Sequence, residues 1–189
     1  VTLSVYTATV QARVTGACGA GYAIRQVNDD GTVVCEPITG GGSNGWLLTG
    51  NAGIDPNSNF LGTTDNVSLT LRVNNTVALR LIPGTSPNLI GGHNSNWITD
   101  GIWGAAIAGG GGSSNANRVT DNYGAIGGGF NNQAGNNSGT TSDGSFAAVG
   151  GGTGNTASGN YTTVGGGNSN TASGNSATIG GGGSNVASG

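Results

Sequence analysis

Few residues in this chain have side chains suited to catalysis, and His93 is its only histidine. Ser95 and Asp100 follow closely, so a hydrolytic triad is the first chemistry to test. Nearness in sequence does not set the geometry that a triad needs. His93 also lies in Gly91-Gly92-His93-Asn94, a polar stretch typical of a loop. We therefore interpret His93 as a loop residue.

Carboxylates and glycine runs give no better catalytic candidate. Glycan hydrolysis needs two carboxylates across a groove, but Glu36 is the only glutamate, and we expect Asp121 and Asp143 in loops. A phosphate-binding loop needs a lysine after its glycines, and the chain has no lysine. No aspartate follows Asp143 to bind calcium in a repeat. We expect no enzyme activity, no cofactor and no metal site.

Two cysteines, Cys18 and Cys35, could form one disulfide or remain as two free thiols. A single pair is typical of an oxidising compartment, so we favour the disulfide and an extracellular or cell-surface location. The bridge would close a hairpin in which Tyr22–Val27 and Thr32–Cys35 flank an Asp-Gly turn.

Tryptophan is the residue type here best suited to binding a ligand through its ring face. Trp97 and Trp103 are the candidate ligand contacts, and Trp46 is the third tryptophan. The chain has few large side chains, so packing in the core or between subunits is the competing interpretation.

Composition excludes several partners. Charged residues make up 7% of the chain and the net charge is -3, with no basic cluster, so nucleic-acid binding is not expected. No apolar run approaches the ~20 residues of a membrane helix, so membrane insertion of this segment is not expected. Glycine occupies 41 positions without a collagen triplet.

The first part of the chain, residues 1–38, is expected to hold a strand and the disulfide-closed hairpin. Residues 1–14 alternate apolar and polar side chains like one long strand. This strand could belong to its own sheet, or it could be an arm that pairs with the open edge of another subunit. Its proposed assembly contacts are Val1, Leu3, Val5, Tyr6 and Val10.

Residues 44–101 are expected to form a β-hairpin or β-prism-like connector. Its clearest element is a hairpin within residues 66–83, with a tight turn at Asn74-Asn75. Each strand has one apolar face and one Ser/Thr/Arg face. We expect the apolar face to be buried and the polar face to be wet.

Residues 102–189 carry the repeat that indicates the fold. Three units of 15 residues end the chain (145–159, 160–174 and 175–189), with imperfect copies before them and an inserted loop at 136–144. Aligning the units predicts a core of stacked small apolar residues and an asparagine ladder. The core columns are Val149, Val164 and Ile179, and Ala157, Ala172 and Ala187; the ladder is Asn155, Asn170 and Asn185.

The predicted fold class is therefore all-β. A strand and hairpin module precedes a Gly-rich, left-handed parallel β-solenoid or β-roll with 15-residue coils. Each coil buries only one Val or Ile and a few Ala, which offsets little of the entropy lost on ordering the chain. Such a thin solenoid favours packing against copies of itself, most simply as a trimer.

Two segments resemble known fibrous proteins. Ser145-Phe146-Ala147-Ala148-Val149-Gly150 and Asn175-Ser176-Ala177-Thr178-Ile179-Gly180 resemble the head repeats of trimeric autotransporter adhesins, although the 15-residue period and the heavier Gly triplet depart from that pattern. Phe60–Asn66 with Leu69–Asn75 resembles trimeric bacterial surface fibres and phage tail-fibre-like proteins. Both resemblances imply an elongated homotrimer and no catalytic residue.

Three functions remain open from the sequence. The first is a structural subunit of an extracellular filament, made of copies of this chain as a trimer or a head-to-tail polymer. The second is a trimeric adhesin head or tail-fibre-like piece that binds a cell surface or a glycan. The third is ice binding by a threonine row, in which Thr163 and Thr178 would stack but Ala148 breaks the row.

Overall fold

The computed structural model describes residues 14, 16–37, 45–47 and 50–189, and these residues are all-β with no helix. The chain divides into two compact units, Val1–Leu61 and Gly62–Gly189. Among the described residues, no helix is long and apolar enough to cross a membrane. The predicted assembly residues Val1, Leu3, Val5, Tyr6 and Val10 lie outside the described residues.

The first unit contains the predicted hairpin, formed by β1 (Tyr22–Val27) and β2 (Val33–Pro37). Its turn is closed by Gly31 N–H donating to the Asn28 carbonyl at 2.9 Å, with Gly31 at φ 87°. The Asp30 carboxylate accepts bonds from the Thr32 N–H and hydroxyl, and these bonds lower the pKa of Asp30.

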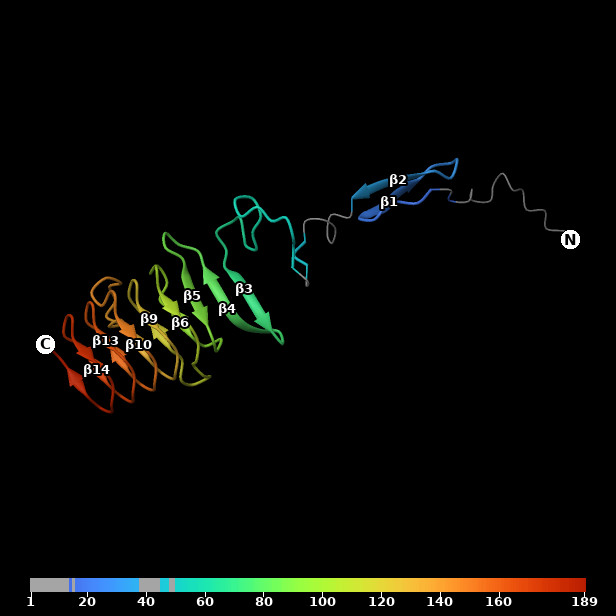
Figure 1. Cartoon of the computed structure of the whole chain (residues 1–189). Coiled ribbons are helices and arrows are strands. Elements are labelled where there is room, and N and C mark those ends of the chain that lie inside the picture. The colour runs from blue at the N-terminus through green and yellow to red at the C-terminus, as the bar shows by residue number, and fades with distance from the viewer. Residues whose placement is uncertain (1–13, 15, 38–44, 48–49) are drawn as a thin grey trace. The chain divides into compact units, whose positions relative to one another are not determined.

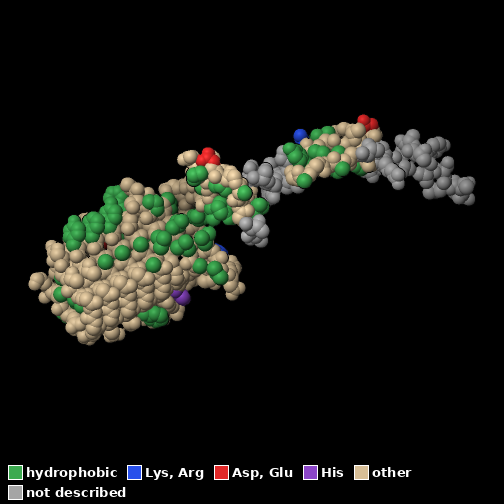
Figure 2. Space-filling view, in the orientation of Figure 1, with side chains coloured by type: hydrophobic (Ala, Val, Ile, Leu, Met, Phe, Trp, Pro, Cys, Tyr) green, Lys and Arg blue, Asp and Glu red, His purple; other side chains and the backbone are tan. Residues whose placement is uncertain are grey.

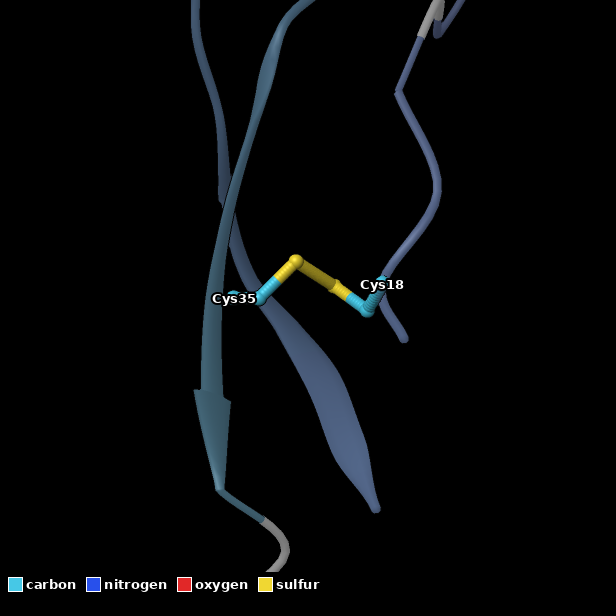
Figure 3. Close-up of a disulfide and its surroundings, with 2 residues drawn as sticks. All are labelled: Cys18 and Cys35. Atoms are coloured by element: carbon cyan, nitrogen blue, oxygen red, sulfur yellow. A yellow bond between two sulfur atoms is a disulfide. The ribbon is translucent and has the colours of Figure 1, made fainter. Parts of the chain in front are cut away.

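The disulfide between Cys18 and Cys35 is present and ties the segment before β1 to β2 (Figure 3). Every residue of β1 is exposed, so the hairpin has little core of its own. Isolated two-stranded hairpins are marginally stable, and a bridge across 17 residues stabilises such a unit by roughly 3 kcal/mol.

The second unit is a parallel β-solenoid of about six turns, which confirms the predicted all-β, parallel solenoid (Figure 1). Its twelve strands alternate between two sheets. In the eight-stranded sheet lie β5 (Asn88–Gly91), β7 (Ala106–Ile107), β9 (Ala125–Ile126), β11 (Ala148–Val149), β13 (Thr163–Val164) and β15 (Thr178–Ile179). In the six-stranded sheet lie β6 (Trp97–Ile98), β8 (Arg118–Val119), β10 (Gln133–Ala134), β12 (Thr156–Ala157), β14 (Thr171–Ala172) and β16 (Val186–Ala187).

Two strands extend the eight-stranded sheet beyond the first coil. β3 (Leu69–Val73) and β4 (Thr76–Ile82) form the predicted hairpin, and β4 pairs antiparallel with β5. Asn74 and Asn75 make its turn at φ 47° and 57°. Because β5 also pairs in parallel with β7, the first coil begins near residue 88, upstream of the boundary at 102 that the repeat pattern indicated.

The coils are not uniform in length. Stacked asparagines are separated along the chain by 21, 15, 23, 15 and 15 residues from the first coil to the last. The 15-residue period therefore holds over consecutive steps only at the C-terminal end. The step of 23 contains the 136–144 insertion, which leaves the strand register intact.

The interior consists of two stacked columns of small apolar side chains. The eight-stranded sheet contributes Ile90, Ile107, Ile126, Val149, Val164 and Ile179, all buried. The six-stranded sheet contributes Ile98, Val119, Ala134, Ala157, Ala172 and the partly buried Ala187. The second column shrinks from Ile to Ala, so later coils bury less apolar area per turn.

The glycine triplets are required where neighbouring coils approach most closely. At Gly152, φ is 86° and a Cβ would overlap the Gly167 carbonyl of the next coil. At Gly151, a Cβ would meet nothing within 4 Å. Glycine is therefore required at some positions of the triplet and not at others, because only some of these residues lie against the backbone of the next coil.

Candidate interaction surfaces

A buried asparagine ladder, here called the inner ladder, runs through the whole solenoid. Its members are Asn96, Asn117, Asn132, Asn155, Asn170 and Asn185, so the three predicted residues are its C-terminal half. The Oδ1 of each accepts the backbone N–H of the next at 2.9–3.0 Å. All but Asn185 are buried.

The side-chain nitrogens of the inner ladder are satisfied as well. Asn155 Nδ2 donates to the Gly151 carbonyl of its own coil and to the Gly167 carbonyl of the next, both at 2.9 Å. Asn132 and Asn170 repeat this pattern with their own glycines. Buried amides cost little only when both ends are bonded, so this ladder is a structural element.

A second set of asparagines, here called the outer ladder, lies at a corner of the coil. The Oδ1 atoms of Asn122, Asn160 and Asn175 accept the backbone N–H groups of Trp103, Ser145 and Asn160 in the preceding coil, at 3.1, 2.9 and 3.2 Å. Within the described residues their Nδ2 groups donate no hydrogen bond. The outer ladder therefore keeps free donors at the surface.

An exposed aromatic row accompanies the outer ladder. Tyr123, Phe146 and Tyr161 each follow an outer-corner residue, and their rings stack with centroids 4.8 and 5.0 Å apart and planes within 7° and 2° of parallel. Stacked carbons touch at about 3.5 Å, so the rings are offset and part of each face is uncovered. The three residues are 42%, 46% and 63% exposed.

The aromatic row and the outer ladder line one groove of about 630 Å³. Figure 2 shows hydrophobic side chains gathered in rows along the solenoid, where charged side chains are few. The lining residues are Trp103, Asn122, Tyr123, Ser142, Ser145, Phe146, Asn160, Tyr161 and Asn175. No acidic or basic side chain is among them.

The hairpin β3–β4 presents its leucines on the outer side of the sheet, which corrects the expectation that this face is buried. Residues paired across strands point to the same side. Arg80 pairs with Ile90, which points into the interior, whereas Leu81 pairs with the outward-facing Leu89. The pattern of the hairpin alone could not show which face the next strand would cover.

These outward leucines form a surface that we call the leucine face. Leu71 and Leu81 are 42% and 37% exposed, and the other members are half-buried. The face comprises Leu69, Leu71, Leu79, Leu81 and Leu89, and paired Ala106, Ala125 and Ala148 continue it along the sheet. Arg80 instead lies on the inner side, where its Nε is buried without a hydrogen-bond partner among the described residues.

The two candidate tryptophans are not brought together. Trp97 lies on β6 in the six-stranded sheet and is 40% exposed. Trp103 lines the groove of the aromatic row and also a notch of about 370 Å³ near Ile98 and Pro83. Trp46, in the other unit, is 58% exposed.

His93 and Ser95 form a local turn structure. The Ser95 N–H donates to His93 Nδ1 at 3.2 Å, and the Ser95 hydroxyl bonds the Gly112 carbonyl at 2.7 Å. Asp100 lines the 370 Å³ notch, whereas His93 and Ser95 do not. Within the described part of the chain, no carboxylate oxygen lies within 4.0 Å of a His93 nitrogen, and no cluster of three acidic, His or Cys residues could hold a metal.

Asp121 and Asp143 anchor the inserted loop. Asp121 is fully buried and accepts the Asn136 and Gly144 N–H groups at 2.8 and 3.2 Å, which closes the base of the loop. Asp143 is exposed, and hydrogen bonds from Thr140, Asn136 and Ser138 lower its pKa to about 2. Both carboxylates therefore serve loop structure.

The aromatic row was missed by the sequence interpretation. Its signal was present: an aromatic residue precedes each of Gly124-Ala125-Ile126, Ala147-Ala148-Val149 and Thr162-Thr163-Val164. The apolar, Ala and Asn columns of the repeat are more regular than this aromatic column, which is absent from the last unit. Only the folded structure shows that these rings stack on one another at the solvent-exposed surface.

Comparisons with known proteins name no relative. No family model matches the chain, and no curated protein or solved structure is significantly similar to it.

Proposed function

We propose that this chain is a non-catalytic structural subunit of an extracellular fibre, and that it acts as an assembly of identical copies, most simply a homotrimer. The observation that supports this most is the leucine face, an apolar surface on the outside of a sheet. Contiguous exposed apolar surface in a soluble protein marks an interaction site. The disulfide supports an oxidising, extracellular location.

A second copy is the partner that this face fits best. The row from Leu69 through Leu81 and Leu89 to Ala148 is uncharged and follows the sheet across its strands. Two or three such faces can pack together without burying any charge. Closed symmetric assemblies are the usual form of a soluble oligomer.

Analytical ultracentrifugation of the full chain tests this proposal. We expect a discrete oligomer, with three times the chain mass for the trimer. The double variant Leu71→Asp/Leu81→Asp should shift it to the monomer, because carboxylates would be buried in the interface. Val186→Asp is the control, since Val186 is 71% exposed on the outer side of the other sheet. A wild-type monomer at micromolar concentration would refute the proposal.

Head-to-tail joining is a further part of the proposal. The six-stranded sheet begins with β6, which within the described part of the chain has a neighbouring strand on one side only. Its free edge can accept an extended segment by strand addition, and the alternating residues 1–14 are the donor we propose. Deleting residues 1–14 should abolish fibres seen by electron microscopy and leave the discrete oligomer intact. Fibres that survive the deletion would refute this mode of joining.

A further inference from the structure

We propose that the groove formed by the aromatic row and the outer ladder binds a neutral linear polysaccharide along the solenoid. This inference does not depend on self-association, because the groove includes no residue of the leucine face.

The groove offers two sets of contacts, aromatic rings and free amide donors. Offset rings at 4.8 and 5.0 Å leave strips of aromatic face uncovered. Beside them, the Nδ2 groups of Asn122, Asn160 and Asn175 donate no hydrogen bond within the described residues, while their oxygens are held by the preceding coil. A sugar ring has an apolar face that packs on an aromatic ring and oxygens that accept from amides.

Charge and shape narrow the ligand further. No acidic or basic side chain lines the groove, so it holds nothing to neutralise a phosphate, a sulfate or a uronic acid. The aromatic rings recur in three successive coils, so a polymer of repeating units can contact them in succession. A neutral polysaccharide meets both conditions.

The backbone conformation at the aromatic row does not itself favour aromatic residues. Tyr123, Phe146 and Tyr161 have φ of 58°, 60° and 58°, a region that favours glycine. The preceding and following coils place Gly104 and Ser176 there, at φ 67° and 61°. The coil thus accepts small residues, and bulky aromatic residues are placed there against the backbone preference.

Affinity electrophoresis of the full chain in gels containing hydroxyethylcellulose, a neutral β-glucan, tests the proposal. We expect the wild type to be retarded, and alginate, an acidic polysaccharide, not to retard it. Tyr161→Ser should weaken binding about tenfold, because one exposed ring is lost. Ser176 at the equivalent position shows that the coil tolerates serine there. Tyr22→Ser is the control, since Tyr22 is an exposed tyrosine in the other unit.

Sedimentation of the same variants separates this proposal from self-association. Unchanged oligomer mass with weakened glucan binding supports a ligand groove. The proposal is overturned if neither hydroxyethylcellulose nor soluble xylan or mannan is bound. It is also overturned if Tyr161→Ser alters the oligomer mass and leaves polysaccharide binding intact, since the row would then be an interface between copies.

Discussion

The inner and outer ladders use the same residue in the same coil and differ in what surrounds the side chain. Asn155 is fully buried and makes a hydrogen bond with every polar group it has. Asn160, five residues later in the sequence, is half-buried and binds the preceding coil through its oxygen alone. The Asn155 side chain joins neighbouring coils through all of its polar atoms, whereas within the described residues the Asn160 side chain leaves its Nδ2 donor free at the surface.

The difference shows that the repeat fixes the position of an amide, whereas burial decides its role. Inside the solenoid, an amide that lost a partner would be left unsatisfied, so both ends are bonded to backbone. At the corner, water can replace a lost partner, so the same amide is free to meet a ligand. The two ladders should therefore differ sharply in their effect on stability.

Replacing Asn155 with Ala should give the largest loss of stability. The change leaves the Asn170 N–H and the Gly151 carbonyl without their partner and takes one of the bonds to the Gly167 carbonyl. We expect the free energy of unfolding in urea to fall by roughly 3–5 kcal/mol. Amide exchange should accelerate first at Asn170.

Asn160→Ala is the matched variant for that comparison. It removes one hydrogen bond, to the Ser145 N–H, at a partly exposed site. We expect a loss of about 1 kcal/mol or less. Equal losses in Asn155→Ala and Asn160→Ala would mean that burial does not distinguish the ladders.

Gly152→Ala should have the next largest effect, because Gly152 lies where the inner ladder brings coils together. An alanine there adopts an unfavourable φ and overlaps the Gly167 carbonyl. We expect a loss of at least ~2 kcal/mol by thermal or urea unfolding. Gly151→Ala, in open space one residue earlier, should change stability by less than about 0.5 kcal/mol. A larger loss at Gly151 would place the close approach elsewhere.

The sequence predicted those features of the solenoid that depend on strict repetition. Val149, Val164 and Ile179 stack in the core, as the alignment indicates, because the 15-residue period is regular there. The earlier turns were harder to place, since the steps of 21 residues from Asn96 to Asn117 and of 23 residues from Asn132 to Asn155 depart from that period. Hydrogen bonding across coils holds register regardless of loop length, and a period search cannot detect that.

Surface roles were less predictable for a different reason. The apolar face of a hairpin is buried by default, but the leucine face points outward because Arg80 pairs with the inward Ile90. The register between β4 and β5 sets this pairing, and the apolar pattern of the hairpin alone does not predict that register. In the same way, the aromatic row becomes a surface only when residues 123, 146 and 161 are stacked by the coil.

Acid should produce the smallest effect and should leave both ladders intact, because amides do not titrate. Asp143 is the sensitive group: hydrogen bonds from Thr140, Asn136 and Ser138 hold its pKa near 2, below the ordinary value of 3.8. The stability it gives the 136–144 loop is therefore complete above pH 4 and is lost as the pH falls through about 2. Amide exchange in that loop, corrected for intrinsic rates, should accelerate between pH 4 and pH 2 while Asn155 and Asn170 stay protected. Asp143→Asn should remove the pH dependence of the loop. The contrary result would be a wild type in which the inner ladder loses protection together with the loop, and an Asp143→Asn variant in which the ladder keeps it. The loop and the coils would then unfold as one cooperative element, and the stability of the inner ladder would not be independent of the surface.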